Sequence, residues 1–400
     1  MVLNTAHTAI RSGAGLNEAI DLLNKAILQF PEDDVLFYLL GGLLKRANRK
    51  EEALRAVAES QRLFLQHENI RDKLTFQAKI QEYSRNRQAY NPPYSQFFSF
   101  ASFEEHTSAF DKKRAFKDSV DYIDFETSSM CNRVCTYCPN SLVDRRSHNI
   151  IIDNTAFTRV IGELAEIEYN RMISLAGHNE PLADRDILTK ISIIRKLLPY
   201  VQILVYSNGD YLKRDYLDEL RAAGLNNLEM SIHPQAGEAY STEHCIDRIN
   251  KMATRLELGA PAISAHSSGV IASLPYDGMS VRMFQNDYAT NGYDWAGLIK
   301  REMPIRTAPC THPIRTFTIR YNGNVMPCCL FSADHDDVND FICGNVKEQS
   351  IFDIYSGPKL VAMRKHVFSN GEKLPPCNTC AKDPSPYESS PLLTNQTKLF

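Results

Sequence analysis

The chain has 400 residues, which exceeds what one hydrophobic core usually organises and favours two or three domains. Lys and Arg (45) nearly balance Asp and Glu (48), so the net charge of −3 argues against a general nucleic-acid or anionic-membrane binder. Hydrophobic residues at 43% and charged residues at 23% are ordinary for a globular protein and exclude disordered and collagen-like chains.

The sequence contains no stretch that resembles a membrane span or a secretory signal. Its longest apolar run, residues 35–44, is about half the length that a bilayer span needs. The N-terminus lacks a basic segment followed by a long apolar stretch. We therefore expect a cytoplasmic protein without a membrane or nucleic-acid partner, whose ten cysteines are thiols or metal ligands rather than disulfides.

Residues 1–90 show the spacing of apolar residues that is typical of helices. The run Asn-Glu-Ala-Ile at 17–20 recurs as Glu-Glu-Ala-Leu at 51–54, and this offset of 34 residues is the tetratricopeptide (TPR) period. A repeat array usually needs about three units, and the sequence shows two. We expect a TPR-like helical domain that supports the rest of the chain or presents a protein partner. An unrelated helical hairpin is the alternative.

Residues 91–117 break this pattern and are rich in Phe, which predicts a linker that packs against another part of the chain. From residue 118 onward, short apolar or alternating runs separate helix-like stretches. The expected strands are 122–126, 171–176, 201–206, 227–232, 262–265 and 280–284, and the expected helices are 155–168, 185–198, 211–224 and 240–258. Strands that alternate with helices predict an α/β fold of parallel βαβ units, with ligands at the C-terminal ends of the strands.

The cysteines gather in two groups at short spacings, which in an intracellular chain favours metal binding. Cys131, Cys135 and Cys138 form a C-x3-C-x2-C motif directly after the first expected strand. A [4Fe-4S] cluster in an electron carrier takes four thiolates, whereas three local thiolates leave one iron with an open position, as in a catalytic metal site. The alternative is a zinc site completed by His148 or by a distant thiol.

A C-x3-C-x-aromatic-C motif at the end of the first strand of a repeated βα domain resembles the radical SAM superfamily. The resemblance implies a partial (β/α)6 TIM-like barrel over residues 118–304. It also implies that Cys131, Cys135 and Cys138 bind a [4Fe-4S] cluster whose fourth iron is chelated by S-adenosylmethionine (SAM). In that family one electron, supplied by a reductase such as flavodoxin or ferredoxin, cleaves SAM to methionine and a 5'-deoxyadenosyl radical, which abstracts a hydrogen atom from the substrate.

The turn after the second expected strand is similar to the Gly-Gly-Glu turn of that family, whose backbone and acid meet the SAM ammonium. Gly177 and Glu180 match this turn, but His178 and Asn179 stand where one or two glycines are usual. The acid is therefore retained, whereas the glycines that would supply the backbone contact are replaced. His178 would either reach the substrate or make a local hydrogen bond.

Two later turns and one aromatic residue extend the resemblance. Ser207-Asn208-Gly209 is similar to a Thr-Asn-Gly turn near the cofactor, and Ser231 lies where the family places polar groups on the SAM ribose. Tyr137 would lie near the adenine. For Ser207 and Ser231, capping of the following turn is the alternative. The resemblance thus implies cofactor-binding roles for Tyr137, Gly177, Glu180, Ser207, Asn208 and Ser231.

The second cysteine group resembles the auxiliary-cluster extension called SPASM, or its shortened form, twitch, over residues 305–382. A C-x2-C pair with two single cysteines supplies four thiolates for one auxiliary [4Fe-4S] cluster, and the ligands would be Cys310, Cys328, Cys377 and Cys380. A structural zinc ion on the same thiolates is the alternative. Cys329 and Cys343 remain, either as spare thiols or as substitute ligands, and Cys245 is expected to be a buried apolar side chain. Residues 383–400 are expected to form a mobile tail.

These features together predict an enzyme that reductively cleaves SAM and abstracts hydrogen from a polar substrate. In relatives with the shortened extension, substrates include aminocyclitols and other carbohydrates, and passing an electron to the auxiliary cluster completes a net oxidation. The first alternative is modification of a ribosomally made peptide or protein, bound in part by the N-terminal helices. The second is a non-catalytic scaffold in which the metal sites only hold the chain together.

Overall fold

We describe a computed structural model of the chain, which covers residues 15–31, 34–66, 100–234, 238–266, 268–332, 334–369 and 371–381. The chain divides into two compact units, Met1–Pro92 and Pro93–Phe400. The expected tail, 383–400, and the first part of the expected linker, 91–99, lie outside the described residues.

In the N-terminal unit, three described helices pack in sequence order through one apolar core. They are α2 (Leu16–Gln29), α3 (Asp34–Arg46) and α4 (Lys50–Gln66), and α3 contacts both of the others. Leu23 and Leu43 are fully buried in this core because they lie on the apolar faces of α2 and α3. The prediction of helices is confirmed for these residues, whereas their identification as TPR repeats stays a prediction.

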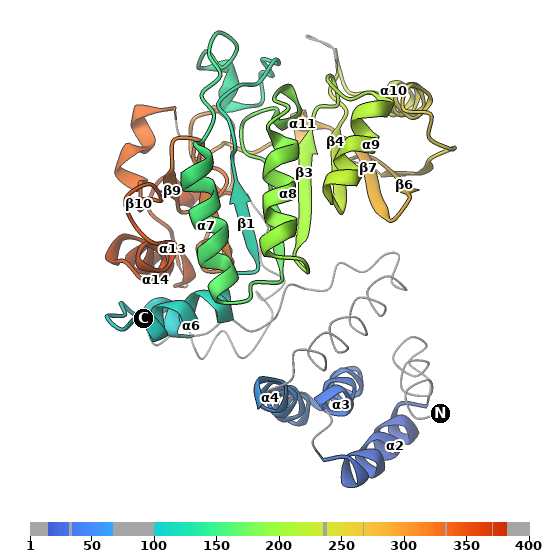
Figure 1. Cartoon of the computed structure of the whole chain (residues 1–400), viewed down its shortest axis with the longest axis vertical. Coiled ribbons are helices and arrows are strands. Elements are labelled where there is room, and N and C mark those ends of the chain that lie inside the picture. The colour runs from blue at the N-terminus through green and yellow to red at the C-terminus, as the bar shows by residue number, and fades with distance from the viewer. Residues whose placement is uncertain are drawn as a thin grey trace. The chain divides into compact units, whose positions relative to one another are not determined.

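In the second unit, the described residues form one sheet of ten strands in the order β10-β9-β8-β1-β2-β3-β4-β7-β6-β5 (Figure 1). Six of these strands are parallel, in the order β8-β1-β2-β3-β4-β7. The strands are β1 (Tyr122–Phe125), β2 (Met172–Ser174), β3 (Gln202–Ser207), β4 (Asn227–Ser231), β5 (Ala262–His266), β6 (Gly269–Tyr276), β7 (Met279–Asn286), β8 (Thr316–Ile319), β9 (Asn324–Met326) and β10 (Gly344–Asn345). This mixed α/β architecture agrees with the predicted fold class.

The helices between the parallel strands cover one face of the sheet. They are α7 (Asn154–Glu166), α8 (Ile187–Leu197), α9 (Arg214–Ala223) and α10 (Thr242–Arg255), and they confirm the four expected helices to within a few residues. Asp153 caps α7, since its carboxylate accepts hydrogen bonds from the backbone N–H groups of Thr155 and Ala156. Figure 1 shows α7 and α8 in front of the sheet.

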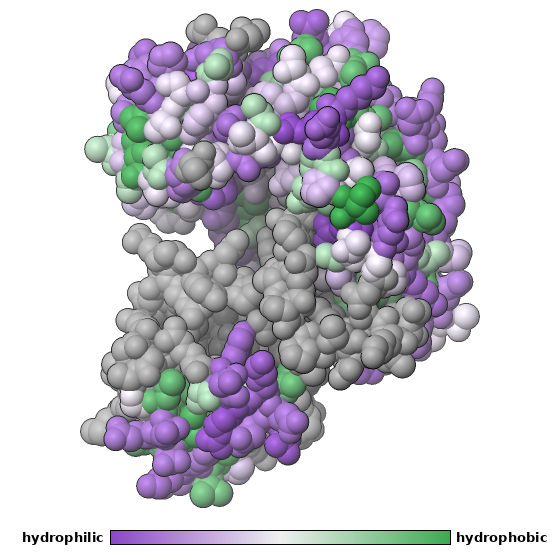
Figure 2. All heavy atoms as spheres, turned by 180° about the vertical axis from the view of Figure 1, so that it is seen from behind, coloured by the Kyte–Doolittle hydropathy of each residue, from purple (hydrophilic) through white to green (hydrophobic). Residues whose placement is uncertain are grey.

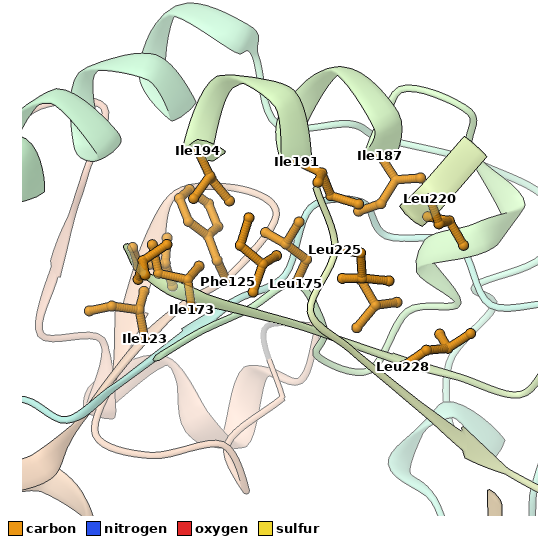
Figure 3. Packing of buried hydrophobic residues seen from close by; sticks show 14 of the residues in the cluster. Ile123, Phe125, Ile173, Leu175, Ile187, Ile191, Ile194, Leu220, Leu225 and Leu228 are labelled. Carbon is orange, nitrogen blue, oxygen red and sulfur yellow. The ribbon is translucent and has the colours of Figure 1, made fainter. Parts of the chain in front are cut away.

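The two faces of the sheet differ in character because successive side chains of a strand point to opposite sides. Ile123 and Phe125 of β1 face the helices, and together with Ile173 and Leu175 they pack beneath Ile187, Ile191 and Ile194 of α8 (Figure 3). The residue between them, Asp124, therefore belongs to the other face. It pairs in register with Ser174 of β2 and Thr318 of β8, so this inner face carries a row of polar side chains.

The edge beyond β7 differs from the expected pattern. The strand expected at 280–284 is confirmed as β7, which is parallel to β4. The strand expected at 262–265 is β5, which is not part of the parallel set, because β5, β6 and β7 form an antiparallel meander. Strand β6 was not predicted. It returns through Asp277 and Gly278, which both have positive φ, as a two-residue hairpin turn requires.

The segment from residue 305 belongs to the same sheet and does not form a separate unit. Strand β8 pairs with β1, and β9 and β10 extend this edge. Short helices complete the segment: α12 (His312–Arg315), α13 (Ile351–Tyr355), α14 (Pro358–Phe368), η4 (Asp336–Phe341) and η5 (Cys377–Thr379). The buried Arg364 of α14 donates hydrogen bonds to the carbonyls of Ser102, Pro313 and Tyr355, so one guanidinium joins three segments.

The expected linker is partly helical, which the sequence prediction missed. It contains η1 (Phe100–Phe103) and the start of α6 (Ala109–Ser119). Phe103 packs on Phe368, and Phe116 packs against three aromatic rings in the main core. Packing against another part of the chain is therefore confirmed. The remaining short elements are η2 (Pro139–Ser141), η3 (Pro181–Ala183) and α11 (Tyr288–Asn291).

The described surface is largely polar. In Figure 2, hydrophilic residues predominate among the described ones on the visible face, and hydrophobic residues occur in small groups. None of the described helices is long and apolar enough to cross a membrane.

We predict that Phe116→Ala lowers the free energy of unfolding by about 3–5 kcal/mol, because it removes a fully buried ring that contacts Phe317, Phe352 and Tyr355. Phe110→Ala on the same helix is the matched control, since Phe110 is 71% exposed. It is expected to cost less than about 0.5 kcal/mol. Anaerobic guanidinium denaturation measures both, and equal losses would contradict the assigned packing.

Candidate functional site

The first cysteine group lies on the loop that leaves the C-terminal end of β1. Cys131, Cys135 and Cys138 carry free thiols that interact electrostatically with one another. Burial raises the pKa of Cys138 to about 12, and the neighbouring thiols act in the same direction. A metal cation would stabilise the thiolates that such an environment otherwise disfavours. The three thiols therefore fit the cluster that the resemblance implies.

Polar side chains tie this loop to the turn after β3. Arg133 forms a bidentate ion pair with Asp210, with N···O distances of 2.7 and 2.6 Å. Asn132 donates to the same carboxylate at 2.8 Å and accepts a hydrogen bond from the Asn208 side chain at 2.7 Å. The cysteine loop is thus fixed to the residues of the Ser207-Asn208-Gly209 turn.

Glu180 joins the turn after β2 to the turn after β3 and to the cysteine loop. Its buried carboxylate accepts hydrogen bonds from Ser207 Oγ at 2.8 Å, from the backbone N–H of Asn208 at 2.6 Å and from that of Leu182 at 2.9 Å. Its own N–H donates to the carbonyl of Met130, next to Cys131. Burial raises the pKa of Glu180 to about 7, although these hydrogen bonds act in the opposite direction. The structure therefore brings Glu180, Ser207 and Asn208 together beside the cysteine loop, while their contact with SAM stays a prediction.

Aromatic rings cover the other side of the loop. Tyr137 stacks on Tyr288, with ring centroids 3.9 Å apart, and its hydroxyl lies 2.6 Å from His233 Nδ1. The hydroxyl of Tyr288 lies 3.0 Å from Ser231 Oγ, which places Ser231 in the same group. The indole N–H of Trp295 donates to the carbonyl of Tyr137 at 2.8 Å. Tyr288 and Trp295 belong to no motif that sequence reasoning uses, so only the fold reveals them.

A buried arginine connects the cysteine loop with both β1 and the segment after β9. Nη1 of Arg145 donates to Glu126 Oε1 at 2.7 Å, and its Nε donates to Asp334 Oδ2 at 2.6 Å. The Arg145 side chain is only 3% exposed. Its carbonyl accepts a hydrogen bond from the backbone N–H of Cys131. We call Glu126, Arg145 and Asp334 the Arg145 triad.

Gly177 makes room for this triad. A Cβ atom at residue 177 would lie 2.6 Å from Cβ and Cγ of Glu126, which is closer than real Cβ contacts come. The next backbone N–H, of His178, donates to Glu126 Oε1 at 2.9 Å. Gly177 therefore matters here because Glu126 approaches its backbone.

His178 is itself buried, with its ring against Trp295 at 5.2 Å between centroids. Burial lowers its pKa well below the usual value, and the nearby Arg320, Arg145 and His335 lower it further. The ring is therefore neutral and carries one N–H donor and one acceptor.

The second cysteine group lines one pocket, as the sequence predicted for an auxiliary cluster. Cys310, Cys328, Cys377 and Cys380 lie in its wall with Arg306 and Lys373. Burial raises the pKa of Cys377 to about 12, and Cys310 and Cys380 raise it further. Four thiols around a single pocket fit a cluster that is held entirely by protein ligands.

The other cysteines and the ligand of the zinc alternative lie elsewhere. Cys343 is not in the wall of that pocket, and its thiol lies 3.3 Å from the carbonyl of Phe341. Cys245 is fully buried in the main core, as expected. His148 is exposed. Among the described residues, no group of three or more His, Cys, Asp or Glu side chains is arranged to hold a metal ion. A four-iron cluster spreads its ligands over a larger volume than one ion does.

Comparison with known proteins identifies two domains in the chain. The model of the radical SAM superfamily matches residues 125–249, and that of the iron-sulfur cluster-binding SPASM domain matches residues 310–381. The S-adenosyl-L-methionine-dependent 2-deoxy-scyllo-inosamine dehydrogenase of Niallia circulans is 23% identical over 247 residues, or 61% of this chain and 85% of the relative. The GTP 3',8-cyclase of Heliobacterium modesticaldum is 25% identical over 149 residues, or 37% of this chain and 45% of the relative.

Solved structures with distant similarity include two complexes with AdoMet. BtrN in complex with AdoMet and 2-DOIA has a TM-score of 0.46 at 22% identity, over 62% of this chain and 87% of that chain. Native anSMEcpe with bound AdoMet and Cp18Cys peptide has a TM-score of 0.36 at 11% identity, over 70% of this chain and 98% of that chain. The two domain matches imply a SAM-binding [4Fe-4S] cluster and auxiliary iron-sulfur binding, as the sequence predicted.

We predict that Gly177→Ala destabilises the protein by about 1–3 kcal/mol, because the added methyl group displaces the buried Glu126 side chain. Gly162→Ala is the matched control, since a Cβ at this position on α7 meets nothing within 4 Å. This control is expected to gain about 0.5–1 kcal/mol from helix propensity. Denaturation midpoints that fail to separate the two variants would show that Glu126 does not need this close approach.

Proposed function

We propose that this chain, which carries a radical SAM domain followed by a SPASM domain, is an oxidoreductase that dehydrogenates a small polar substrate of the sugar or aminocyclitol class. The observation that carries the proposal is the pair of cysteine groups. One has three thiols on a loop at the C-terminal end of β1, and the other has four thiols around one pocket.

The two cysteine groups differ in whether they leave an iron atom without a protein ligand. Cys131, Cys135 and Cys138 would hold one cluster and leave an iron for SAM, whereas Cys310, Cys328, Cys377 and Cys380 would saturate the other. When bound, these cofactors would supply hydrogen-atom abstraction through SAM cleavage and an acceptor for the second electron. A saturated cluster has no position for substrate, so the substrate must be bound by the chain's own side chains.

Buried contacts within the second unit hold the loops and turns around the first cysteine group. The Arg145 triad joins the cysteine loop to β1 and to the segment after β9, and the Glu180 carboxylate joins the turns after β2 and β3. Charged groups buried in this way keep one arrangement, because breaking a buried ion pair costs several kcal/mol. These groups hold the cysteine loop and the turns after β2 and β3 in fixed positions.

The substrate class is supported by two observations. The inner face of the sheet carries the polar row Asp124, Ser174 and Thr318, in place of the apolar residues that would bind a hydrocarbon. The Niallia circulans relative, by its name, dehydrogenates an aminocyclitol, and the similarity spans 85% of its length. We therefore place the preferred substrates among polyhydroxylated rings.

We predict that the anaerobically reconstituted protein binds about eight iron atoms per chain, for two four-iron clusters, and forms 5'-deoxyadenosine from SAM with dithionite. Cys135→Ala is expected to lose SAM cleavage. Cys377→Ala is expected to lose about four iron atoms and the oxidised product while some SAM cleavage remains. Cys245→Ala is the control, since this thiol lies in the apolar core and not in either cysteine group.

Iron analysis and chromatography of the reaction mixture distinguish these outcomes. A Cys135→Ala chain that cleaves SAM as the wild type does would contradict the assignment of the first group. An unaltered iron content in Cys377→Ala would contradict that of the second. A reconstituted wild type that never forms 5'-deoxyadenosine would favour the scaffold alternative.

A further inference from the structure

His178 is a buried residue whose surroundings come from several segments of the second unit. It lies on the turn after β2, and its backbone is held on both sides, because its N–H donates to Glu126 and its carbonyl accepts from Asn140 Nδ2 at 2.6 Å. Its ring packs against Trp295, whose indole N–H binds the carbonyl of Tyr137 on the cysteine loop. Arg320, which acts on the His178 ring electrostatically, comes from the end of β8. The ring thus faces residues of both domains.

The His178 side chain is only 4% exposed, and neither of its ring nitrogens has a hydrogen-bond partner among the described residues. Burying such a donor and acceptor without partners is unfavourable, because each group loses its hydrogen bonds to water. If residue 178 served only to pack the core, an apolar ring would fill the same space without burying unpaired polar atoms.

Other buried polar atoms without hydrogen-bond partners lie on the inner face of the sheet, on the strands next to the turn that carries His178. Among the described residues, these include Glu126 Oε2, Nε and Nη1 of Arg320, Ser174 Oγ and Thr318 Oγ1, and all four residues are fully buried. The register of the parallel strands places these residues on one side of the sheet. Ser174 and Thr318 flank Asp124 in one row of the inner face. Glu126 and Arg320 follow Asp124 and Thr318 by two residues each, and therefore lie on the same side.

We propose that His178, together with Glu126, Arg320, Ser174 and Thr318, binds the hydroxyl groups of a compact polyhydroxylated ring, against the face of Trp295. This inference rests on the proposed function and names the residues that hold its substrate. A hydroxyl group both donates and accepts hydrogen bonds, and the group offers both kinds of partner: donors on Arg320, an acceptor on Glu126 and both on His178. The Glu126 carboxylate also suits an amino substituent.

The ring-shaped, polar character of the ligand follows from the same residues. A peptide segment would need an extended groove with backbone partners, whereas these atoms converge from the ends of three neighbouring strands, β1, β2 and β8. An apolar ligand would leave every one of them unsatisfied. Trp295 supplies a flat apolar surface for the C–H face of a ring.

Trp295 makes the proposal directly measurable, because it is the single tryptophan of the chain. The anaerobic holoenzyme is titrated with 2-deoxy-scyllo-inosamine, with myo-inositol and with cyclohexanol, which has a ring of the same size and one hydroxyl. Binding is followed by equilibrium dialysis and by the fluorescence of Trp295. We expect that at least one of the two polyols binds and changes this fluorescence, and that cyclohexanol does not bind.

His178→Phe keeps the ring and removes both nitrogens, and we expect it to weaken polyol binding at least tenfold. His178→Asn, which keeps a donor and an acceptor, is expected to lose less. His244→Phe is the matched control, because His244 is exposed on α10 and paired with Glu238. It should bind as the wild type does. Thr318→Val provides a second variant of unchanged shape, for which we expect at least threefold weaker binding.

Four results would overturn the inference. They are a wild type that binds neither polyol, a polyol that binds by dialysis without affecting Trp295, cyclohexanol that binds as tightly as the polyols, and His178→Phe and Thr318→Val chains that both bind as the wild type does. SAM cleavage without polyol is measured in parallel. Its absence in the wild type would count against the proposed function, whereas the binding experiment tests His178 in either case.

Discussion

One buried ion pair system, the Arg145 triad, is the constraint on which the rest of the second unit depends. A guanidinium that is 3% exposed must be paired, because the free energy of burying an isolated charge exceeds the net stability of a domain. Arg145 lies on the segment after the cysteine loop, Glu126 follows β1, and Asp334 follows β9. Satisfying one charge therefore joins three segments, and the one with Asp334 lies 189 residues from Arg145 in the sequence.

Hydrogen bonds extend this constraint to the other turns at the C-terminal ends of the strands. Glu126 also accepts from the backbone of His178, and Glu180 connects the same turn to Ser207 and Asn208. The spacing of the cysteines determines which thiols can share a cluster, while the acidic residues determine where the clusters' loops lie. The residues inferred around His178 to bind the substrate lie within this set of contacts.

Local patterns in the sequence predicted the cysteine groups, the four covering helices and the parallel strands β1, β2, β3, β4 and β7, because each depends on short spacing or on periodicity. Strand β6 was missed although Asp277-Gly278 is a hairpin signal between two alternating runs. Strand β8 was also missed, although it has the same length as the predicted β1. Arg145, Asp334, Tyr288 and Trp295 could not be predicted, since their polar partners lie 13 to 189 residues away and no motif connects them. The sequence singled out His178 as a departure from a glycine-rich turn that would either reach the substrate or make a local hydrogen bond.

A double-mutant cycle on Arg145 and Glu126 tests the central claim most directly. Unfolding free energies are measured anaerobically for Arg145→Met, Glu126→Gln and the double variant. We expect Arg145→Met alone to cost about 3–5 kcal/mol, because it leaves two carboxylates without their cation, and the double variant to cost clearly less than the sum of the single ones. Additive losses of less than about 1 kcal/mol each would show that the guanidinium does not hold these segments together.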